Sequence, residues 1–394
     1  MQGIKFIDEV EIKNKKVLLR VDFNVSLNPD FTIADDFRIR QSISTINHLL
    51  NNYNKLIIVT HLGRPKTYDV NLSLEPVVKD LQKYLPDYKV TLVNNFLAND
   101  SLLLFENQTT KEILVLENIR FYPQEEQNDV DFSKKLAKLA DVFVNDAFAV
   151  ANRNHASVVG ITKHLPSYGG LLLKKEITII SSAVENPKKP FLAIVGGAKI
   201  KSKIGLINRL TEIADDLIVG GGLANTFLKA QGFEVGKSLH DSKNLNAVRR
   251  LFFLASEKNT TIQLPVDVVA GNPTDRHKIQ IVSVDAIPKN LSILDVGPQS
   301  LAKFGAIINK AKTIIWNGPV GYIENPAFRR GTDFIYYAIA QNTTATSIVG
   351  GGDTLAAISK KEYLDKITHI STGGGAMLEF IEKGTLPGIE ALKK

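Results

Sequence analysis

The chain has 394 residues, a formal net charge of +7 from 48 lysines and arginines against 41 aspartates and glutamates, and no cysteine. The length predicts two domains, and the absence of cysteine excludes disulfides, thiolate chemistry and cysteine-type zinc sites. No apolar run approaches the roughly 18 residues of a membrane span, and the N-terminus has no signal-peptide pattern, so we expect a cytoplasmic protein. The basic excess fits an anionic ligand or nucleic acid and does not choose between them.

Short β-branched runs recur along the chain, each followed by a Gly-, Asp- or Asn-rich turn and a helix-like stretch. Apolar strands that alternate with helical patterns indicate parallel sheets covered on both faces. The sequence therefore predicts an α/β protein with two doubly wound, Rossmann-like domains, whose ligands bind beyond the carboxyl ends of the strands. The expected strands cover residues 16–23, 55–62, 89–93, 112–119 and 141–148 in the first half, and 191–197, 215–222, 261–269, 312–319, 346–352 and 369–375 in the second.

One periodic stretch separates the two halves. Residues 169–190 start with two glycines, continue as a helical pattern and end at Asn-Pro. We therefore predict an N-terminal domain over 1–170 and an interdomain helix over 171–190 that acts as a hinge. The C-terminal domain is expected over 191–375, and the segment 376–394 is expected to pack back on the N-terminal domain.

Arginines follow apolar runs at five places in the first half. A guanidinium is permanently charged and binds phosphate or carboxylate oxygens in a fork-like geometry. Arginines that converge from several strand ends would form a site for a small, highly anionic ligand. The five are Arg20, Arg38, Arg64, Arg120 and Arg153.

Other polar residues accompany these arginines. Asp22 and Asn24 in RVDFNV could simply close a turn. Together with Arg20 they make three ligand-capable groups at one strand end, which is more than a turn needs. His61 in THLGRP could be a satisfied core histidine, although its place beside Arg64 favours anion binding.

Glycines take the place of arginines in the second half. In GGAKIKSK they precede Lys199 and Lys203 at an expected helix start, where the helix dipole favours a phosphate. These lysines are four residues apart, so on a helix they would share one face. GGGDT (350–354) and STGGGA (371–376) imply close backbone approach to a ligand. Asp353 could reach a magnesium ion or cap a helix.

In this order, the motifs resemble those of the phosphoglycerate kinase family over essentially the whole chain. The resemblance implies reversible phosphoryl transfer between 1,3-bisphosphoglycerate and ADP, giving 3-phosphoglycerate and ATP, in glycolysis and gluconeogenesis. It further implies Mg²⁺ with the nucleotide, a monomer, and in-line transfer across a closing interdomain cleft, with no nucleic-acid or membrane partner. The matching motifs are RVDFNV, IADDFRI, HLGRP, LENIRF, DAF with R.HAS (146–157), PFLAIVGGAK, IVGGGLANTF, LPVDVV, WNGPVGYIE, GGGDT, ISTGGGA and LPG.

The resemblance assigns the acid substrate to the N-terminal half. Asp22 and Asn24 would hold the glycerate, and Arg38 would lie at the transferring group. Arg20 has no role carried over and is expected to be structural. The implied substrate-binding residues are Asp22, Phe23, Asn24, Arg38, His61, Leu62, Gly63, Arg64, Arg120 and Arg153.

The resemblance assigns the nucleotide to the C-terminal half. Lys199 would stabilise the moving phosphoryl group with Arg38, Gly373 and Gly374, while Asp353 would contact Mg²⁺. The implied nucleotide-binding residues are Gly197, Lys199, Lys203, Gly221, Asn317, Glu324, Gly351, Gly352, Asp353 and Thr354.

Some positions depart from the family pattern, and other classes remain open. Ala149 and Asn152 stand where many members have glycine and histidine, and Ser202 stands where aspartate is common. A non-catalytic nucleotide- or nucleic-acid-binding protein is one alternative. A nicotinamide dehydrogenase is another, although the chain lacks a GxGxxG fingerprint between a strand and a helix.

Overall fold

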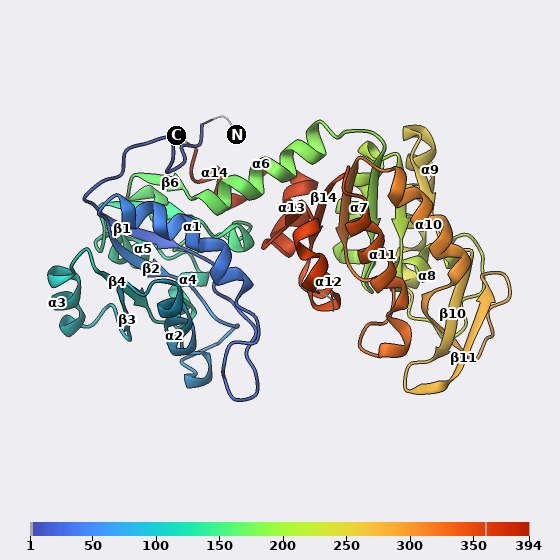
Figure 1. Cartoon of the computed structure of the whole chain (residues 1–394), viewed down its shortest axis with the longest axis horizontal. Coiled ribbons are helices and arrows are strands. Elements are labelled where there is room, and N and C mark those ends of the chain that lie inside the picture. The colour runs from blue at the N-terminus through green and yellow to red at the C-terminus, as the bar shows by residue number, and fades with distance from the viewer. Residues whose placement is uncertain (1–2, 359–360, 394) are drawn as a thin grey trace. The chain divides into compact units, whose positions relative to one another are not determined.

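The computed structural model describes residues 3–358 and 361–393. Its contacts divide the chain into two compact units. Unit 1 is Met1–Thr178 with Thr385–Lys394, and unit 2 is Ile179–Gly384. Helix α6 (Leu171–Glu185) carries the chain from unit 1 into unit 2 (Figure 1).

Unit 1 contains a six-stranded sheet in the order β3-β4-β2-β1-β5-β6, and every neighbouring pair is parallel. The expected strands of the first half are present. The strand 89–93 has the expected bounds, and the other four end earlier than expected, so their polar motifs lie in loops. The sixth, edge strand was not expected. The strands are β1 (Lys16–Arg20), β2 (Lys55–Val59), β3 (Lys89–Val93), β4 (Glu112–Leu116), β5 (Val142–Asn145) and β6 (Ser167–Gly169).

Helices cover both faces of this sheet because successive strand residues point to opposite sides. Val17 and Leu19 of β1 belong to one buried cluster, which α1 and α2 complete. Leu18 belongs to the other, which α3 and α5 complete. The helices are α1 (Phe37–Asn51), α2 (Glu75–Tyr84), α3 (Asn99–Asn107), α4 (Pro123–Glu126), α5 (Val130–Ala137) and α14 (Pro387–Glu390).

Unit 2 repeats this architecture with a parallel sheet in the order β15-β14-β13-β7-β8-β9. Helices α10 and α11 pack over one face, around the buried Trp316. The strands are β7 (Phe191–Val195), β8 (Asp216–Val219), β9 (Thr261–Gln263), β13 (Thr313–Asn317), β14 (Thr346–Gly350) and β15 (His369–Ile370). The helices are α7 (Ile204–Ile213), α8 (Gly221–Ala230), α9 (Leu245–Lys258), α10 (Pro298–Lys310), α11 (Arg330–Gln341), α12 (Gly352–Ala357) and α13 (Gly375–Lys383). The predicted fold class, two parallel α/β sheets with helices, is confirmed.

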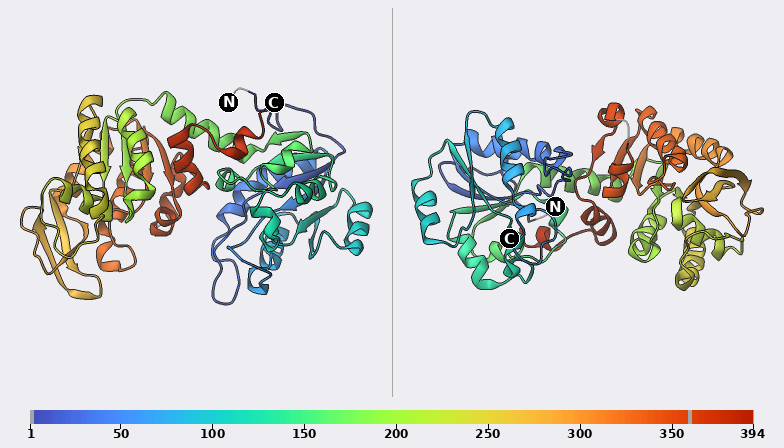
Figure 2. Two further views of the ribbon diagram at one scale, coloured as in Figure 1. Left: turned by 180° about the vertical axis from the view of Figure 1, so that it is seen from behind. Right: turned by 90° about the horizontal axis from the view of Figure 1, so that it is seen from below.

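One expected strand, 261–269, is wrong. The chain leaves the parallel sheet after β9, and Pro265, which has no N–H for a ladder, lies in the break. A second strand then begins in a small antiparallel sheet of order β11-β10-β12 (Figures 1 and 2). Its strands are β10 (Asp267–Asn272), β11 (Asp275–Ser283) and β12 (Ser292–Val296).

The last described residues return to unit 1. The Gly388 N–H of α14 donates to the Ala151 carbonyl at 2.7 Å. Helix α13 instead packs on α7 in unit 2, so the division falls at Gly384/Thr385, later than the expected residue 376.

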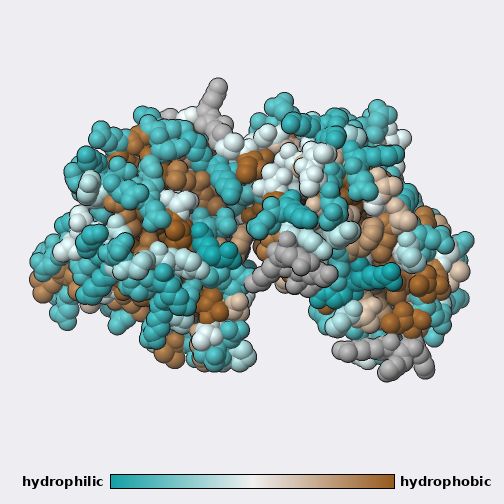
Figure 3. Space-filling view, in the orientation of Figure 1, coloured by the Kyte–Doolittle hydropathy of each residue, from teal (hydrophilic) through white to brown (hydrophobic). Residues whose placement is uncertain are grey.

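The surface is mainly polar on the face in Figure 3, where hydrophobic residues form scattered patches. Within 3–358 and 361–393, no helix is both long enough and apolar enough to cross a membrane.

Candidate functional site

The polar motifs of unit 1 lie at one edge of its sheet. Asp22 and Asn24 follow β1, and the segment 61–64 follows β2. Arg120 lies in the 3-10 helix η2 (Ile119–Phe121) after β4. Because these strands are parallel, their carboxyl ends meet at the same edge, where ligands bind in such sheets.

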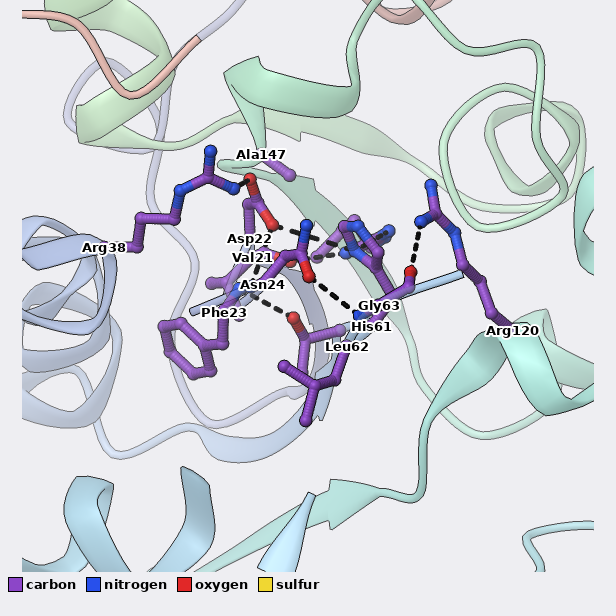
Figure 4. Close-up of polar contacts among 12 residues, drawn as sticks. Val21, Asp22, Phe23, Asn24, Arg38, His61, Leu62, Gly63, Arg120 and Ala147 are labelled. Carbon is purple, nitrogen blue, oxygen red and sulfur yellow. Dashed lines mark hydrogen bonds and ion pairs between the residues drawn. The ribbon is translucent and has the colours of Figure 1, made fainter. Parts of the chain in front are cut away.

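Asp22 and Asn24 connect the loops after β1 and β2. The Asp22 carboxylate is 6% exposed and forms an ion pair with Arg38, which lies in the first turn of α1. The Asn24 side-chain oxygen accepts a hydrogen bond from the Gly63 N–H at 2.8 Å. A further hydrogen bond fixes the loop that contains Phe23, because the Phe23 N–H donates to Thr60 Oγ1 at 2.8 Å (Figure 4).

His61 is buried between Asp22 and Arg20. Arg20 Nη2 donates to His61 Nδ1 at 3.3 Å, and Asp22 Oδ1 lies 3.7 Å from the same nitrogen. A guanidinium can only donate, so the proton of a neutral His61 is on Nε2. Burial, with the charges of Arg20, Arg120 and Arg38, holds the pKa of His61 well below its usual range. His61 is therefore a neutral hydrogen-bond donor near pH 7.

Three of the predicted arginines line one pocket of about 610 Å³ in unit 1. Arg120 is only 8% exposed and donates to the Gly63 carbonyl at 2.7 Å, whereas Arg64 and Arg153 are exposed. Arg38 lies at the opposite end of the cluster from Arg120 (Figure 4). The pocket is lined by Arg64, Pro65, Lys66, Arg120, Pro123, Glu126, Gln127, Arg153 and His155.

This pocket is strongly cationic. It contains three arginines and a lysine against the single carboxylate of Glu126, which lies 3.5 Å from Arg120 Nε. Burial and the charges of Arg120, Arg20 and Arg153 lower the pKa of His155 to about 4. His155 is therefore neutral at pH 7. The arrangement suits a small ligand with phosphate or carboxylate groups.

The glycine-rich segments of unit 2 also lie beyond the carboxyl ends of parallel strands. They follow β7, β8, β13, β14 and β15. Gly197 has a φ of +99° and Gly221 a φ of +61°. A Cβ at Gly221 would lie 3.0 Å from the backbone of Gly197, so two loops approach each other there as only glycine permits.

Lys203 and Asn317 form the polar centre of these loops. Lys203 Nζ donates to the Gly196 carbonyl at 2.6 Å and to Asn317 Oδ1 at 2.7 Å. Asn317 Nδ2 donates to the Gly350 carbonyl at 2.7 Å. The hydroxyl of Thr354, in α12, accepts from the Gly318 N–H at 2.7 Å. These side chains therefore link the three loops to one another by hydrogen bonds to side-chain and backbone atoms.

The sequence interpretation of Lys199 and Lys203 needs one correction. We expected both on one face of a helix, but α7 begins only at Ile204. Lys199 is extended and precedes a short 3-10 helix, η5 (Ile200–Ser202), and Lys203 is the residue before α7. The two lysines therefore do not lie on one face of a helix, and the Lys199 side chain is exposed.

The remaining predicted residues of unit 2 are placed as follows. Glu324 is exposed in the segment between β13 and α11, and Gly352 starts α12 after Gly351, whose φ is +107°. Gly373 and Gly374 directly precede α13. The Asp353 side chain lies outside the described part of the structure.

Among the described residues, no group of three His, Asp or Glu side chains could hold a metal ion.

A sequence model of the family described as phosphoglycerate kinase matches residues 7–384. The chain belongs to the phosphoglycerate kinase family. The phosphoglycerate kinase of Dictyoglomus turgidum is 46% identical over 384 residues, which are 97% of this chain and 96% of that protein. The phosphoglycerate kinase of Pelotomaculum thermopropionicum is 43% identical over 390 residues, 98% of each chain. The family predicted from the motifs is confirmed.

Solved structures of phosphoglycerate kinases have the same fold. The structure from Coxiella burnetii has a TM-score of 0.87 and 38% identity, covering 99% of this chain and 98% of that one. The structure from Pyrococcus horikoshii OT3 has a TM-score of 0.85 and 31% identity, with the same coverage.

Two residues near the candidate phosphoglycerate kinase site were not singled out from the sequence as ligands. Arg20 is completely buried and donates to His61 and, at 2.9 Å, to Ser157 Oγ. His155 lines the cationic pocket. Its place in ANRNHAS, two residues after Arg153, was the available signal.

Proposed function

We propose that this chain catalyses the reversible transfer of a phosphoryl group between 1,3-bisphosphoglycerate and ADP, giving 3-phosphoglycerate and ATP. A terminal oxygen of ADP forms the new P–O bond while the bond from phosphorus to the acyl oxygen breaks. The carboxylate leaves with the electron pair, and no proton has to move. The gathering of Arg64, Arg120 and Arg153 in one pocket carries the proposal, in a chain whose family is known.

Unit 1 would bind the phosphoglycerate. The cationic pocket would hold its stable phosphate, because several guanidiniums can donate to one phosphate in fork geometry. Asp22 would accept from the glycerate hydroxyl group, and the Asn24 amide could donate to the hydroxyl or carboxyl oxygens. Arg38 would face the transferring group, since it retains donors beyond those that the Asp22 carboxylate can accept.

Unit 2 would bind the nucleotide. The phosphates would approach the backbone beside Gly197, Gly221 and Gly351, and Lys203 would add a positive charge. The N–H groups of Gly197 and Gly221 themselves donate to the Pro319 and Val320 carbonyls. Mg²⁺ would enter with the nucleotide as part of the substrate, with Asp353 and Thr354 near it.

Catalysis would depend on charge stabilisation, because a loose phosphoryl transition state needs little covalent help from the protein. Lys199, Arg38 and the backbone at Gly373 and Gly374 would supply it. Direct transfer further requires that the two bound substrates come into contact. We also propose that the chain acts as a cytoplasmic monomer.

A coupled assay tests this function. Purified protein is given ADP, Mg²⁺ and 1,3-bisphosphoglycerate, and ATP is measured. We expect ATP formation that requires both substrates. A chain that binds ADP without forming ATP would instead be a non-catalytic nucleotide-binding protein.

A further inference from the structure

The segment 318–331 of unit 2, which runs from the end of β13 into the first turn of α11 and carries Glu324, is held in place by two buried side chains. They are Asp295 in β12, which is 3% exposed, and Thr332 in α11, which is 1% exposed. Neither belongs to the predicted site.

The Asp295 carboxylate fills the space between the two ends of this segment. Its Oδ2 accepts from the Gly331 N–H at 2.8 Å, and its Oδ1 accepts from the Val296 N–H at 2.9 Å. A Cβ at Gly321 would lie 2.3 Å from Oδ1, and so would a Cβ at Gly331. Gly321 and Gly331 therefore both pack directly on the Asp295 carboxylate, with no space for a side chain at either position.

Further hydrogen bonds fix the same segment to its surroundings. Thr332 Oγ1 accepts from the Val320 N–H at 3.1 Å and from the Gly321 N–H at 3.2 Å. The Tyr322 N–H donates to the Leu294 carbonyl of β12 at 2.7 Å.

The other end of the antiparallel sheet contributes as well. Asn325 Nδ2 donates to the Pro273 carbonyl, in the turn between β10 and β11, at 3.0 Å. The small sheet thus contacts the segment from one strand, β12, and from the turn between β10 and β11.

We propose that Asp295 is a positioning residue for nucleotide binding. Its carboxylate would fix the position of the 318–331 segment relative to the antiparallel sheet, and thereby place Glu324 at the nucleotide. Thr332 assists it. This inference rests on the proposed function, because it takes ADP as the ligand of unit 2.

A carboxylate suits this place better than its isosteric amide. Both oxygens of Asp295 accept from backbone N–H groups. In Asp295→Asn one of them becomes an NH₂ group that faces a donor, so one contact is replaced by a repulsion. Burial raises the pKa of Asp295 to about 7, so the measurements are made at pH 8, where the carboxylate is ionised.

The test is direct calorimetric binding of ADP and of 3-phosphoglycerate to wild type, Asp295→Asn and Thr332→Val, with steady-state kinetics beside it. Thr260→Val is the matched control. Thr260 is a buried threonine of unit 2 whose hydroxyl bonds the Thr211 and Ala214 carbonyls, before the start of β8 and far from the carboxyl strand ends.

We expect Asp295→Asn to weaken ADP binding roughly tenfold and Thr332→Val to weaken it by about three- to tenfold. Binding of 3-phosphoglycerate and kcat should stay within about twofold in both. Thr260→Val should leave both affinities unchanged.

Unchanged ADP affinity in a folded Asp295→Asn would overturn the inference. So would an equal loss of ADP affinity in Thr260→Val, because the effect would then be general destabilisation. If Asp295→Asn does not fold, the ADP affinity of Thr332→Val is the deciding measurement, and an unchanged value would overturn the inference. A wild type that binds ADP but makes no ATP would end the proposed function, while the affinities would still judge Asp295.

Discussion

The two units contain similar sheets but present different chemistry at the carboxyl ends of their strands. Unit 1 offers charged side chains, with Arg120 and His61 buried beside one another. Unit 2 offers mainly backbone, with positive φ at Gly197, Gly221 and Gly351. A site built from side chains loses affinity when a charge is removed, whereas a site built from backbone loses it when a methyl group is added.

The cost of each design differs too. In unit 1 burial, together with the charges of neighbouring arginines, disfavours the protonated form of the histidines, so the pKa values of His61 and His155 fall. In unit 2 the cost is conformational, because glycine loses more backbone freedom on folding than any other residue. The following experiments challenge this contrast, from the largest expected effect to the smallest.

Lys199→Ala should have the largest effect, since Lys199 is the exposed lysine that we place at the moving phosphoryl group. We expect kcat to fall about 10²- to 10³-fold, because the contact would belong mainly to the transition state. KM values should change little. Steady-state kinetics measures both, with the exposed neighbour Lys201→Ala as control. A kcat within a few-fold of wild type would remove Lys199 from the mechanism.

Gly351→Ala should test the backbone design of unit 2. A Cβ there would lie 2.5 Å from Asn317 Nδ2, which is bonded to the Gly350 carbonyl. We expect the KM for ADP to rise about tenfold or more. Gly232→Ala is the control, because its φ of +98° is similarly unfavourable but no heavy atom lies within 4 Å of the new Cβ. Equal effects in both variants would show that only backbone strain matters.

Arg64→Ala should test the side-chain design of unit 1. Removing one charged donor from the pocket should raise the KM for 3-phosphoglycerate roughly tenfold, as expected for a charge-assisted hydrogen bond. The KM for the nucleotide should not change. Lys135→Ala, which removes an exposed charge elsewhere in unit 1, serves as control. A larger effect on the nucleotide than on 3-phosphoglycerate would reverse the assignment of the two units.

His155→Gln should have the smallest effect on catalysis and appear mainly in stability. The pKa of His155 is lowered to about 4 in the folded chain, against about 6.5 unfolded. Between these values the unfolded state binds more protons, so the free energy of unfolding falls as pH falls. Relative to the variant, wild type should lose up to about 1.4 kcal/mol per pH unit between pH 6.5 and 4. Urea unfolding at several pH values measures this, and parallel curves for both proteins would contradict it.

The sequence predicted the parallel strands well because their apolar runs are continuous and bounded by glycine or polar turns. It did not predict β10, β11 and β12, since their pairing depends on a turn and a register that apolar patterns do not encode. The predicted start of the helix near Lys199 was wrong for a similar reason. The spacing of the two lysines suggested a helix, but the chain first forms a glycine-rich loop and a 3-10 turn, so α7 begins only at Ile204.

The candidate site could be predicted as a set of residues but not as a geometry. Parallel strands place Asp22, His61 and Arg120 at one edge, and this follows from the pattern alone. That Arg120 bonds the Gly63 carbonyl, or that Arg20 orients His61, depends on how separate loops pack. Their individual roles in catalysis stay predictions.

Unit 2 is a continuous stretch of chain, whereas unit 1 is closed by a segment that follows it. The last contacts of unit 1 include the hydrogen bond from Gly388 to Ala151, where a Cβ on Gly388 would lie 2.7 Å from Val158. During synthesis on the ribosome, every residue of unit 2 emerges before this segment does. Unit 2 can therefore fold while unit 1 still lacks its final segment, and the complete fold of unit 1 should form after that of unit 2 in a newly made chain.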